Sequence, residues 1–278
     1  MLDNNCLICN KKCEHFKVWN KYKIFICKIC KLSFIQKKKE ETNKVFSPSE
    51  KSFYEKSILG DTEREDLFTK KISKNRISFY EKLLGRKPLN ILEVGCGTAV
   101  SSNGFLKNDI KYTGIELDES IFKFAISKKR NVIYGDFLKF DFEKKFDIIF
   151  ASQVVEHIEN PNIFFKKCNE ILNTNGILHI DVPNDNSMIS YLRKIFKNNK
   201  YYGAIRPPFH MRAFSQTSLK NLFLKNNFYL VKTFSKINSD RTFGQLVLKV
   251  PFKIAILFGL QKLTGLNSLL VGVAQKKQ

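Results

Sequence analysis

The fold is decided by the stretch Leu92-Glu93-Val94-Gly95-Cys96-Gly97-Thr98-Ala99. It ends an apolar run that is typical of a buried strand, and it precedes an amphipathic segment that predicts a helix. Glycines at such a junction let the backbone turn sharply and approach a ligand closely. Glu116 ends the next apolar run, 19 residues after Gly97. That spacing suits a carboxylate that accepts both ribose hydroxyls of a nucleoside, whereas Val100 replaces the third glycine of a dinucleotide fingerprint and disfavours NAD and FAD.

The chain from residue 89 onward alternates short apolar runs with amphipathic segments. The runs predict strands at 90–94, 111–116, 131–134, 146–151, 176–182, 227–234 and 268–275. The amphipathic segments predict helices at 99–107, 119–129, 161–173, 188–199 and 216–226. This alternation predicts an α/β fold, with a doubly wound, mostly parallel seven-stranded sheet that is covered by helices on both faces.

Three regions divide the chain. Residues 1–35 hold five of the seven cysteines and predict a small zinc ribbon. Residues 36–88 are polar and predict a helical linker or lid that ends at Gly85 and Pro88. Residues 89–278 form the predicted main domain, in which the long connection at about 185–214 predicts an insertion over the site.

Composition excludes several classes of protein. The 278 residues are 43% hydrophobic, which supports a sizeable core and argues against disorder. Seven cysteines are too few for a disulfide scaffold of this length. No run of 18 apolar residues and no secretory signal is present in the sequence, so we expect a cytoplasmic protein without a transmembrane segment.

The net charge of +22 is unevenly distributed. Residues 186–278 carry sixteen basic residues and a single acid, Asp240. Such a field attracts anions, including nucleic acid, phosphorylated metabolites and an anionic membrane face. The abundance of Lys, Asn, Ile and Phe is also what A+T-rich codons produce, so functional charge and codon drift are both open interpretations of the sequence.

Four cysteines form two Cys-x-x-Cys pairs, Cys6 with Cys9 and Cys27 with Cys30. Two such knuckles predict one tetrahedral, structural zinc ion with four thiolate ligands. Asn10 follows the first knuckle, where a left-handed residue is often needed, and Lys31 follows the second, where glycine would be easier. Cys13 or His15 could replace one ligand. A redox pair or free thiols are the alternative interpretation.

Four segments, taken in order, resemble the motifs of class I S-adenosylmethionine-dependent methyltransferases. They are Glu93-x-Gly95-x-Gly97, Gly114-Ile115-Glu116-Leu117-Asp118, Tyr134-Gly135-Asp136-Phe137 and the run from Phe146 to His157. The resemblance covers about residues 50–278, and Ala99 departs from it where the family usually has a third glycine. The N-terminal cysteines and the segment from His210 to Ser215 resemble a branch that modifies sugars and other small molecules.

The resemblance implies a cofactor, S-adenosylmethionine, and a role for each matching residue. Gly95 and Gly97 would pack against the methionine part of the cofactor. Glu93 would lie near its ammonium group, although a surface cap is the alternative for this residue. Glu116 would hold the ribose hydroxyls.

Three further residues follow from the resemblance. Asp136 would accept a hydrogen bond from the adenine amino group, with Phe137 beside the ring. Phe137 is equally well suited to a plain core position. Gln153 would lie just past the fourth strand, where the sulfonium and the acceptor should meet.

His157 and His210 are the candidate catalytic residues, as a general base or as groups that position the acceptor. His179 lies inside an apolar strand and is expected to be structural. Arg206 and Arg212 flank His210 and could clamp an anion.

The expected function is that of a methyltransferase acting on a small molecule. Its acceptor would be a sugar hydroxyl or carbon of an anionic nucleotide-linked or lipid-linked intermediate, and a lipid-linked acceptor would imply peripheral membrane contact. The first alternative is an RNA methyltransferase that grips phosphates with its basic flanks. The second is a non-enzymatic zinc-ribbon binding protein, against which the intact glycine loop and Glu116 argue.

Overall fold

The computed structural model describes residues 4–13, 16–20, 22–35, 65, 75–196, 201–207, 209–236 and 264–277. The chain divides into two compact units. The first comprises residues 1–43, 153–166 and 180–274, and the second comprises residues 44–152, 167–179 and 275–278. Within the described ranges, no helix is both long and apolar enough to span a bilayer.

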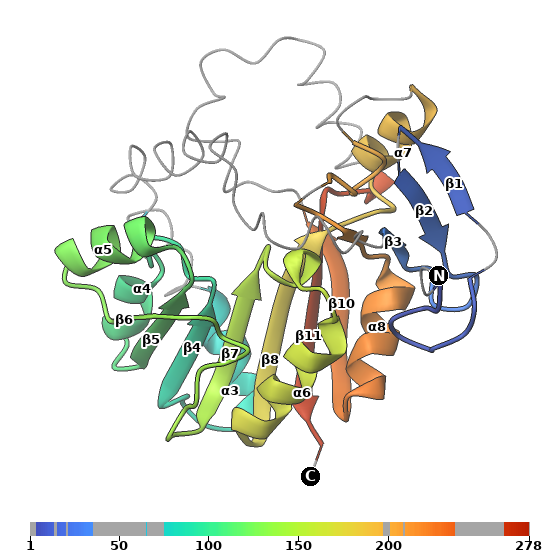
Figure 1. The fold of residues 1–278 in the computed structure, drawn as a ribbon. Coiled ribbons are helices and arrows are strands. Elements are labelled where there is room, and N and C mark those ends of the chain that lie inside the picture. The colour runs from blue at the N-terminus through green and yellow to red at the C-terminus, as the bar shows by residue number, and fades with distance from the viewer. Residues whose placement is uncertain are drawn as a thin grey trace. The chain divides into compact units, whose positions relative to one another are not determined.

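A seven-stranded sheet in the order β10-β11-β8-β7-β4-β5-β6 forms the main element of the fold (Figure 1). Its strands are β4 (Asn90–Val94), β5 (Lys111–Glu116), β6 (Val132–Tyr134), β7 (Phe146–Ser152), β8 (Leu172–Pro183), β10 (Phe228–Lys236) and β11 (Leu269–Lys276). β4 pairs in parallel with both β5 and β7, and β5 pairs in parallel with β6. The chain therefore reverses its direction of travel across the sheet at β4, which is where open α/β sheets bind ligands. All seven predicted strands are confirmed, with ends that differ by up to four residues.

The helices of the second unit follow local signals in the sequence. They are α3 (Ile77–Leu84), α4 (Ser102–Leu106), α5 (Glu119–Ser127) and the second half of α6 (Pro161–Ile171), from residue 167 onward. α3 ends at Gly85, as predicted. The φ of Gly85 is 69°, the left-handed conformation that commonly ends a helix. Asp118 caps the N-terminus of α5, because its side chain accepts a hydrogen bond from the Ile121 amide. α4 is shorter than the predicted helix over 99–107 because Ala99 is left-handed, with φ of 55°.

Asp147 shows how a carboxylate is tolerated in the buried strand β7. It forms an ion pair with Arg86 at 2.6 Å, and it accepts hydrogen bonds from the Leu89 amide and the Asn173 side chain. Burial opposes ionisation of this group, but these donors hold the pKa of Asp147 below its usual value. The buried Asp147 carboxylate in this otherwise apolar strand is therefore compensated by an ion pair and hydrogen bonds.

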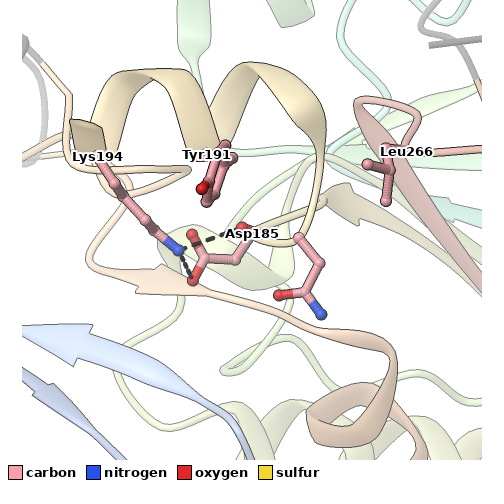
Figure 2. Close-up of a pocket in the computed structure, with 5 residues that line it drawn as sticks. Asp185, Tyr191, Lys194 and Leu266 are labelled. Atoms are coloured by element: carbon pink, nitrogen blue, oxygen red, sulfur yellow. Dashed lines mark hydrogen bonds and ion pairs between the residues drawn. The ribbon is translucent and has the colours of Figure 1, made fainter. Parts of the chain in front are cut away.

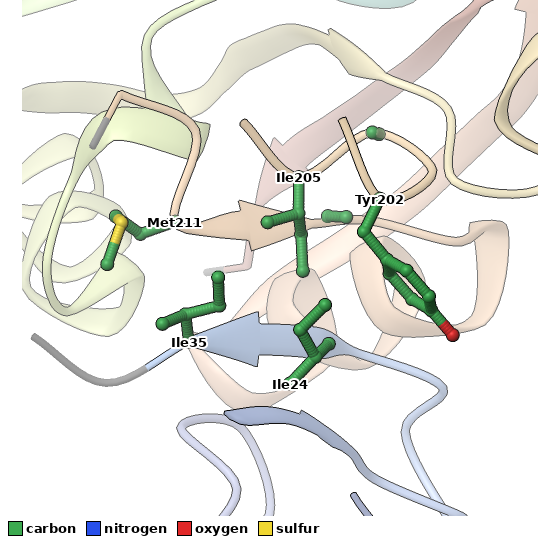
Figure 3. Close-up of a cluster of buried hydrophobic side chains, with 7 residues drawn as sticks. Ile24, Ile35, Tyr202, Ile205 and Met211 are labelled. Atoms are coloured by element: carbon green, nitrogen blue, oxygen red, sulfur yellow. The ribbon is translucent and has the colours of Figure 1, made fainter. Parts of the chain in front are cut away.

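The N-terminal ribbon belongs to the first unit. β1 (Phe16–Trp19), β2 (Tyr22–Ile26), β3 (Ser33–Ile35) and β9 (Arg212–Ala213) form an antiparallel sheet in this order. A cluster of buried side chains joins the ribbon to the 201–213 segment (Figure 3), and it consists of Ile24, Ile35, Tyr202, Ala204, Ile205, Met211 and Ala213. The ribbon is therefore held to the insertion by both strand pairing and apolar contact.

Among its described residues, the first unit also contains the first half of α6 and the helices η4 (Val155–His157), α7 (Met188–Ile195) and α8 (Gln216–Lys225). α8 begins with a capping box between Ser215 and Ser218. Phe165, Phe223 and Phe228 stack edge to face beneath α8, with ring centroids 5.0–6.2 Å apart. The predicted helical segment over 36–88 lies largely outside the described residues, so its boundaries stay a prediction.

Asp185 is the polar centre of the insertion. Its carboxylate pairs with Lys194 at 2.9 Å and accepts hydrogen bonds from the Ser33 hydroxyl and the Ala204 amide. Gly203 has φ of 60°, and a Cβ at this position would collide with both Asp185 and Lys194. The left-handed backbone and this close approach together favour glycine at position 203.

We predict that Gly203→Ala lowers the free energy of unfolding by about 2–4 kcal/mol, because left-handed strain adds to a collision inside a packed region. The matched control is Gly85→Ala, which has the same backbone strain with no heavy atom within 4 Å of the added Cβ. It should cost about 1–2 kcal/mol. Denaturant unfolding of both variants measures the difference, and equal losses would contradict the contact at Asp185.

Candidate functional site

The glycine loop after β4 is left-handed at three positions. Gly95, Gly97 and Ala99 have φ of 61°, 57° and 55°. The amides of Gly95 and Cys96 both donate to the Ile115 carbonyl, which ties the loop to β5. A Cβ on Gly97 would have no heavy atom within 4 Å, so the loop is open there. The loop can therefore accept a ligand close to its backbone.

Glu116 stands at the end of β5 beside this loop. One carboxylate oxygen accepts a hydrogen bond from the Gly97 amide at 2.8 Å. The other accepts from the amides of Leu117 at 2.9 Å and Asp118 at 3.0 Å. Burial raises the pKa of Glu116 above its usual value, although the three amides favour the charged form. The structure thus brings Glu116 and Gly97 together, as their spacing suggested.

Glu93 faces the interior of the second unit. Its carboxylate accepts hydrogen bonds from the Tyr112 hydroxyl at 2.6 Å and from the Ser101 hydroxyl. Burial raises the pKa of Glu93. Sequence reasoning missed both partners, although a tyrosine in an otherwise apolar strand was a usable signal. This buried network fixes the strand end from which the glycine loop leaves.

Arg130 is a second group that sequence reasoning missed. Its buried guanidinium donates to the Thr98 carbonyl of the loop at 2.6 Å and to the Glu65 carboxylate at 2.7 Å. Glu65 also accepts a hydrogen bond from the Asn103 side chain. Arg130 therefore ties residue 65 to the loop, and no local pattern in the sequence indicates this long-range pairing.

Asp136 and Phe137 follow β6. The Asp136 carboxylate accepts from the Leu138 amide at 2.9 Å and lies 3.9 Å from the Lys139 ammonium. Phe137 is buried, and its ring centroid lies 6.0 Å from that of Phe142. Both residues therefore sit at the carboxyl end of β6, with the Phe137 ring packed inward.

Gln153 directly follows β7 and has an unusual backbone. Its φ of 59° is left-handed, which is uncommon for a residue with a side chain. Its amide donates to the Asp181 carbonyl at 2.8 Å. Its side-chain nitrogen is buried, and no described residue offers it a hydrogen-bond partner. Such strain and unmet polar capacity are features of functional positions.

The two candidate catalytic histidines lie together in the first unit. The ring centroids of His157 and His210 are 4.7 Å apart, with an interplanar angle of 84°. Glu156 is fully buried next to them, and one ligand atom from each of the three residues lies within 4.8 Å of the others. The sequence analysis identified both histidines but missed Glu156.

The four cysteines of the predicted knuckles converge. The thiol sulfurs of Cys6, Cys9, Cys27 and Cys30 all lie within 4.8 Å of one another. The two knuckles repeat one backbone geometry: the amides of Asn10 and Lys31 each donate to the first cysteine's carbonyl at 2.8 Å, and their φ values are 58° and 56°. A cluster of this geometry fits a tetrahedral zinc ion.

The thiol acidities differ within this cluster. Burial raises the pKa of Cys6 well above its usual value and that of Cys30 to about 11. Burial also opposes ionisation of Cys27, but hydrogen bonds from the Cys30 backbone and the Cys6 side chain make its pKa lower than usual. Binding of a metal cation would stabilise the thiolate forms of these cysteines.

Cys13 lies outside the four-cysteine cluster. Its thiol donates to the Lys11 carbonyl at 3.7 Å, and burial raises its pKa to about 12. His15 lies outside the described residues. The described cluster therefore supports the Cys6, Cys9, Cys27 and Cys30 ligand set.

A cavity of about 370 Å³ lies beside α7 (Figure 2), lined by Asp185, Asn186, Tyr191, Lys194 and Leu266. Figure 2 shows the Lys194 ammonium against the Asp185 carboxylate. The Asp185 carboxylate is already bonded to Lys194, Ser33 and Ala204. The surface that this cavity presents to a ligand is therefore mainly aromatic and apolar.

Comparison with known proteins gives a family and a set of relatives. The family model for a methyltransferase domain matches residues 64–233. The ubiquinone biosynthesis O-methyltransferase of Coxiella burnetii is 27% identical over 119 residues, covering 40% of this chain and 50% of that protein. Its counterpart in Glaesserella parasuis is 30% identical over 114 residues, covering 37% and 47%. The chain thus spans about half the length of the curated relatives it matches.

Solved structures share the fold. The plantazolicin methyltransferase BpumL, in complex with SAH, has a TM-score of 0.57 at 18% identity, covering 84% of this chain and 93% of that one. A SAM-dependent methyltransferase from Archaeoglobus fulgidus has a TM-score of 0.52 at 20% identity, covering 76% and 94%. These likenesses confirm the predicted Rossmann-like class I methyltransferase fold.

We predict that Tyr112→Phe lowers the free energy of unfolding by about 1–3 kcal/mol, because it leaves the buried Glu93 carboxylate without one of its donors. The control is Tyr134→Phe, since Tyr134 is 50% exposed. That change should stay within about 0.5 kcal/mol. Denaturant unfolding tests both variants, and a silent Tyr112→Phe would show that the loop does not depend on this network.

Proposed function

The chain belongs to the methyltransferase-domain family, and from this premise we propose that it is an enzyme that transfers a methyl group from S-adenosylmethionine to a small-molecule acceptor. The observation that carries the proposal is the open glycine loop bonded to Glu116 at the carboxyl ends of β4 and β5. Neighbouring parallel strands end at this edge, where ligands of α/β sheets bind.

The cofactor would lie across the ends of these strands. Gly95 and Gly97 would face its methionine part, and Glu116 would accept the ribose hydroxyls. A carboxylate has about four acceptor positions, and three backbone amides already occupy three of them. Ribose binding would therefore turn the carboxylate and release the Gly97 amide toward the ligand. Asp136 would accept from the adenine amino group, with Phe137 as the apolar support behind it.

The reaction needs little beyond alignment, because the methyl group of a sulfonium is already activated. Holding the acceptor in line with that methyl can lower the barrier by about 7–11 kcal/mol. Gln153, with its strained backbone, and His157 with His210 would serve the acceptor. If one histidine removes a proton from a hydroxyl, the gain is about 10²–10⁴-fold.

The acceptor would be an oxygen nucleophile on a small, anionic molecule, such as a nucleotide-linked or lipid-linked sugar. The names of the relatives describe O-methyltransferases, and the basic excess of residues 186–278 favours an anion. Arg206 is exposed and available to such a group. Arg212 is buried and donates to the Glu159 carbonyl through one nitrogen, and its Nε and Nη1 atoms have no hydrogen-bond partner among the described residues, so its part in binding the anion stays a prediction.

Zinc would be structural in this scheme. Four thiolates close its coordination sphere and leave no position for a substrate. Its proposed role is to fold the ribbon, whose strand β3 pairs with β9 beside His210.

We predict that Glu116→Ala weakens S-adenosylmethionine binding by about 1–3 kcal/mol, because the charge-assisted bonds to the ribose are lost. Glu119→Ala, an exposed acid at the start of α5, is the control and should leave affinity unchanged. Isothermal calorimetry measures both. Equal affinities for wild type and Glu116→Ala would remove the ribose assignment.

We predict one zinc ion per chain in protein purified without chelator. Cys27→Ser should lose the metal and destabilise the ribbon, because a zinc–thiolate bond is removed from a closed site. Cys13→Ser should retain the metal, since Cys13 lies outside the cluster. Elemental analysis of the three proteins is the measurement, and a fully stable wild type without metal would refute the structural role.

Product formation with nucleotide sugars and with bulk RNA, from low to physiological salt, tests the acceptor class. A small anion meets one or two charges, so we expect a shallow salt dependence and a several-fold rise in KM for Arg206→Ala. Lys220→Ala, an exposed lysine in α8, is the control. A steep salt dependence with methylated RNA would instead establish the RNA alternative, and neutral sugars methylated independently of Arg206 would reject the anionic acceptor.

A further inference from the structure

Glu156, His157 and His210 form a second group of metal-ligand side chains, separate from the four cysteines. One ligand atom of each residue lies within 4.8 Å of the other two. Ligand atoms that share one ion at about 2.0–2.2 Å lie about 3–3.5 Å apart. Since His157 is exposed and His210 only half-buried, rotation of the two imidazoles can close this difference.

The group is buried on one side and open on the other. The Glu156 carboxylate is fully buried, whereas His157 reaches solvent. An ion bound by the three ligand atoms would contact the Glu156 carboxylate on its buried side and would keep open positions on the side of the histidines.

The backbone holds the two histidines in place from separate segments. Arg206 and His210 exchange two backbone hydrogen bonds, at 3.0 and 2.9 Å, and the carbonyl of the next residue, Met211, accepts from the Ile35 amide of the ribbon at 2.9 Å. β9 packs against η4, and the Arg212 side chain donates to the Glu159 carbonyl two residues after His157. His210 is thus positioned by the ribbon and joined to the His157 segment, as a prearranged ligand set requires.

We propose that Glu156, His157 and His210 bind one divalent transition-metal ion, and that the open positions of this ion take two neighbouring hydroxyl oxygens of the acceptor. Two imidazoles and one carboxylate on one side of an ion form a ligand set known to leave such positions free. The four-cysteine site is closed, so of the two ligand clusters in the described part of the chain the second is the one that can offer open positions. The part of the proposal that concerns the acceptor rests on the proposed methyl transfer.

The metal would activate the acceptor oxygen. Coordination lowers the pKa of a bound hydroxyl, so its proton passes to solvent near neutral pH. The oxygen then forms its bond to the methyl carbon while the bond from sulfur to that carbon breaks. The products are a methyl ether and S-adenosylhomocysteine, and one proton has been released overall.

Equilibrium dialysis of the zinc-containing protein against Co²⁺ tests the site without any turnover. We expect one cobalt ion per chain in addition to the zinc, with weak visible bands and no strong thiolate-to-cobalt absorption. His157→Ala and His210→Ala should each weaken cobalt binding by at least about tenfold. Mutation of a residue that only hydrogen-bonds to a metal ligand already causes a loss of this size. His157 is exposed, so its variant should fold normally. Glu159→Gln, an exposed acid three residues after Glu156, should bind cobalt like wild type.

The competing arrangement uses Arg212 of β9 as the internal counter-charge of Glu156 and leaves no room for an ion. It predicts no cobalt beyond the cysteine site, or equal cobalt affinity in wild type and His157→Ala, and either result would overturn the metal proposal. S-adenosylmethionine affinity, measured on the same samples, separates the two ideas. Normal cofactor binding without cobalt would reject only the metal site, whereas absent cofactor binding would reject the proposed function.

Catechol and phenol are the probes for the acceptor. Catechol presents two neighbouring hydroxyls, so it should shift the visible bands of the cobalt protein at concentrations at which phenol does not. Identical spectra with both probes would overturn the two-oxygen acceptor.

Discussion

The hydrogen bond from the Gly97 amide to the Glu116 carboxylate joins the ends of β4 and β5, two neighbouring parallel strands of the sheet. A loop with three left-handed residues cannot satisfy its own amides in regular structure, so it needs acceptors supplied from outside. The Ile115 carbonyl and the Glu116 carboxylate of β5 supply them. The register of β4 on β5, which pairs Val94 with Ile115, therefore sets the shape of the loop.

The same constraint explains the polar groups buried around the loop. Glu93 on β4 and Tyr112 on β5 lie on the two strands that frame it, and Arg130 holds the Thr98 carbonyl from the turn before β6. In the other unit, the two cysteine knuckles play a comparable part. They shape the ribbon, its strand β3 pairs with β9, and this pairing fixes the backbone beside His210. The glycine loop and the backbone beside His210 thus both keep a geometry that side chains distant in the sequence maintain.

Much of this was accessible from the sequence, because it rests on local signals. Strand periodicity located all seven strands, and the spacing of the cysteines located the four converging thiols. Long-range pairings were not accessible. The two-residue strand β9 has no periodicity to detect, and the ion pair of Arg130 with Glu65 joins residues 65 positions apart. Glu156 was missed because an acid beside a histidine has no distinctive pattern until His210 is brought to it by the fold.

A crystal structure of the chain with S-adenosylhomocysteine tests most directly whether the β4 loop and Glu116 form the cofactor site. We expect both ribose hydroxyls within about 3 Å of the Glu116 carboxylate, with the Gly97 amide turned toward the ligand. A ligand bound elsewhere, or one bound here while all three backbone amides keep their bonds to an unmoved Glu116, would contradict this assignment.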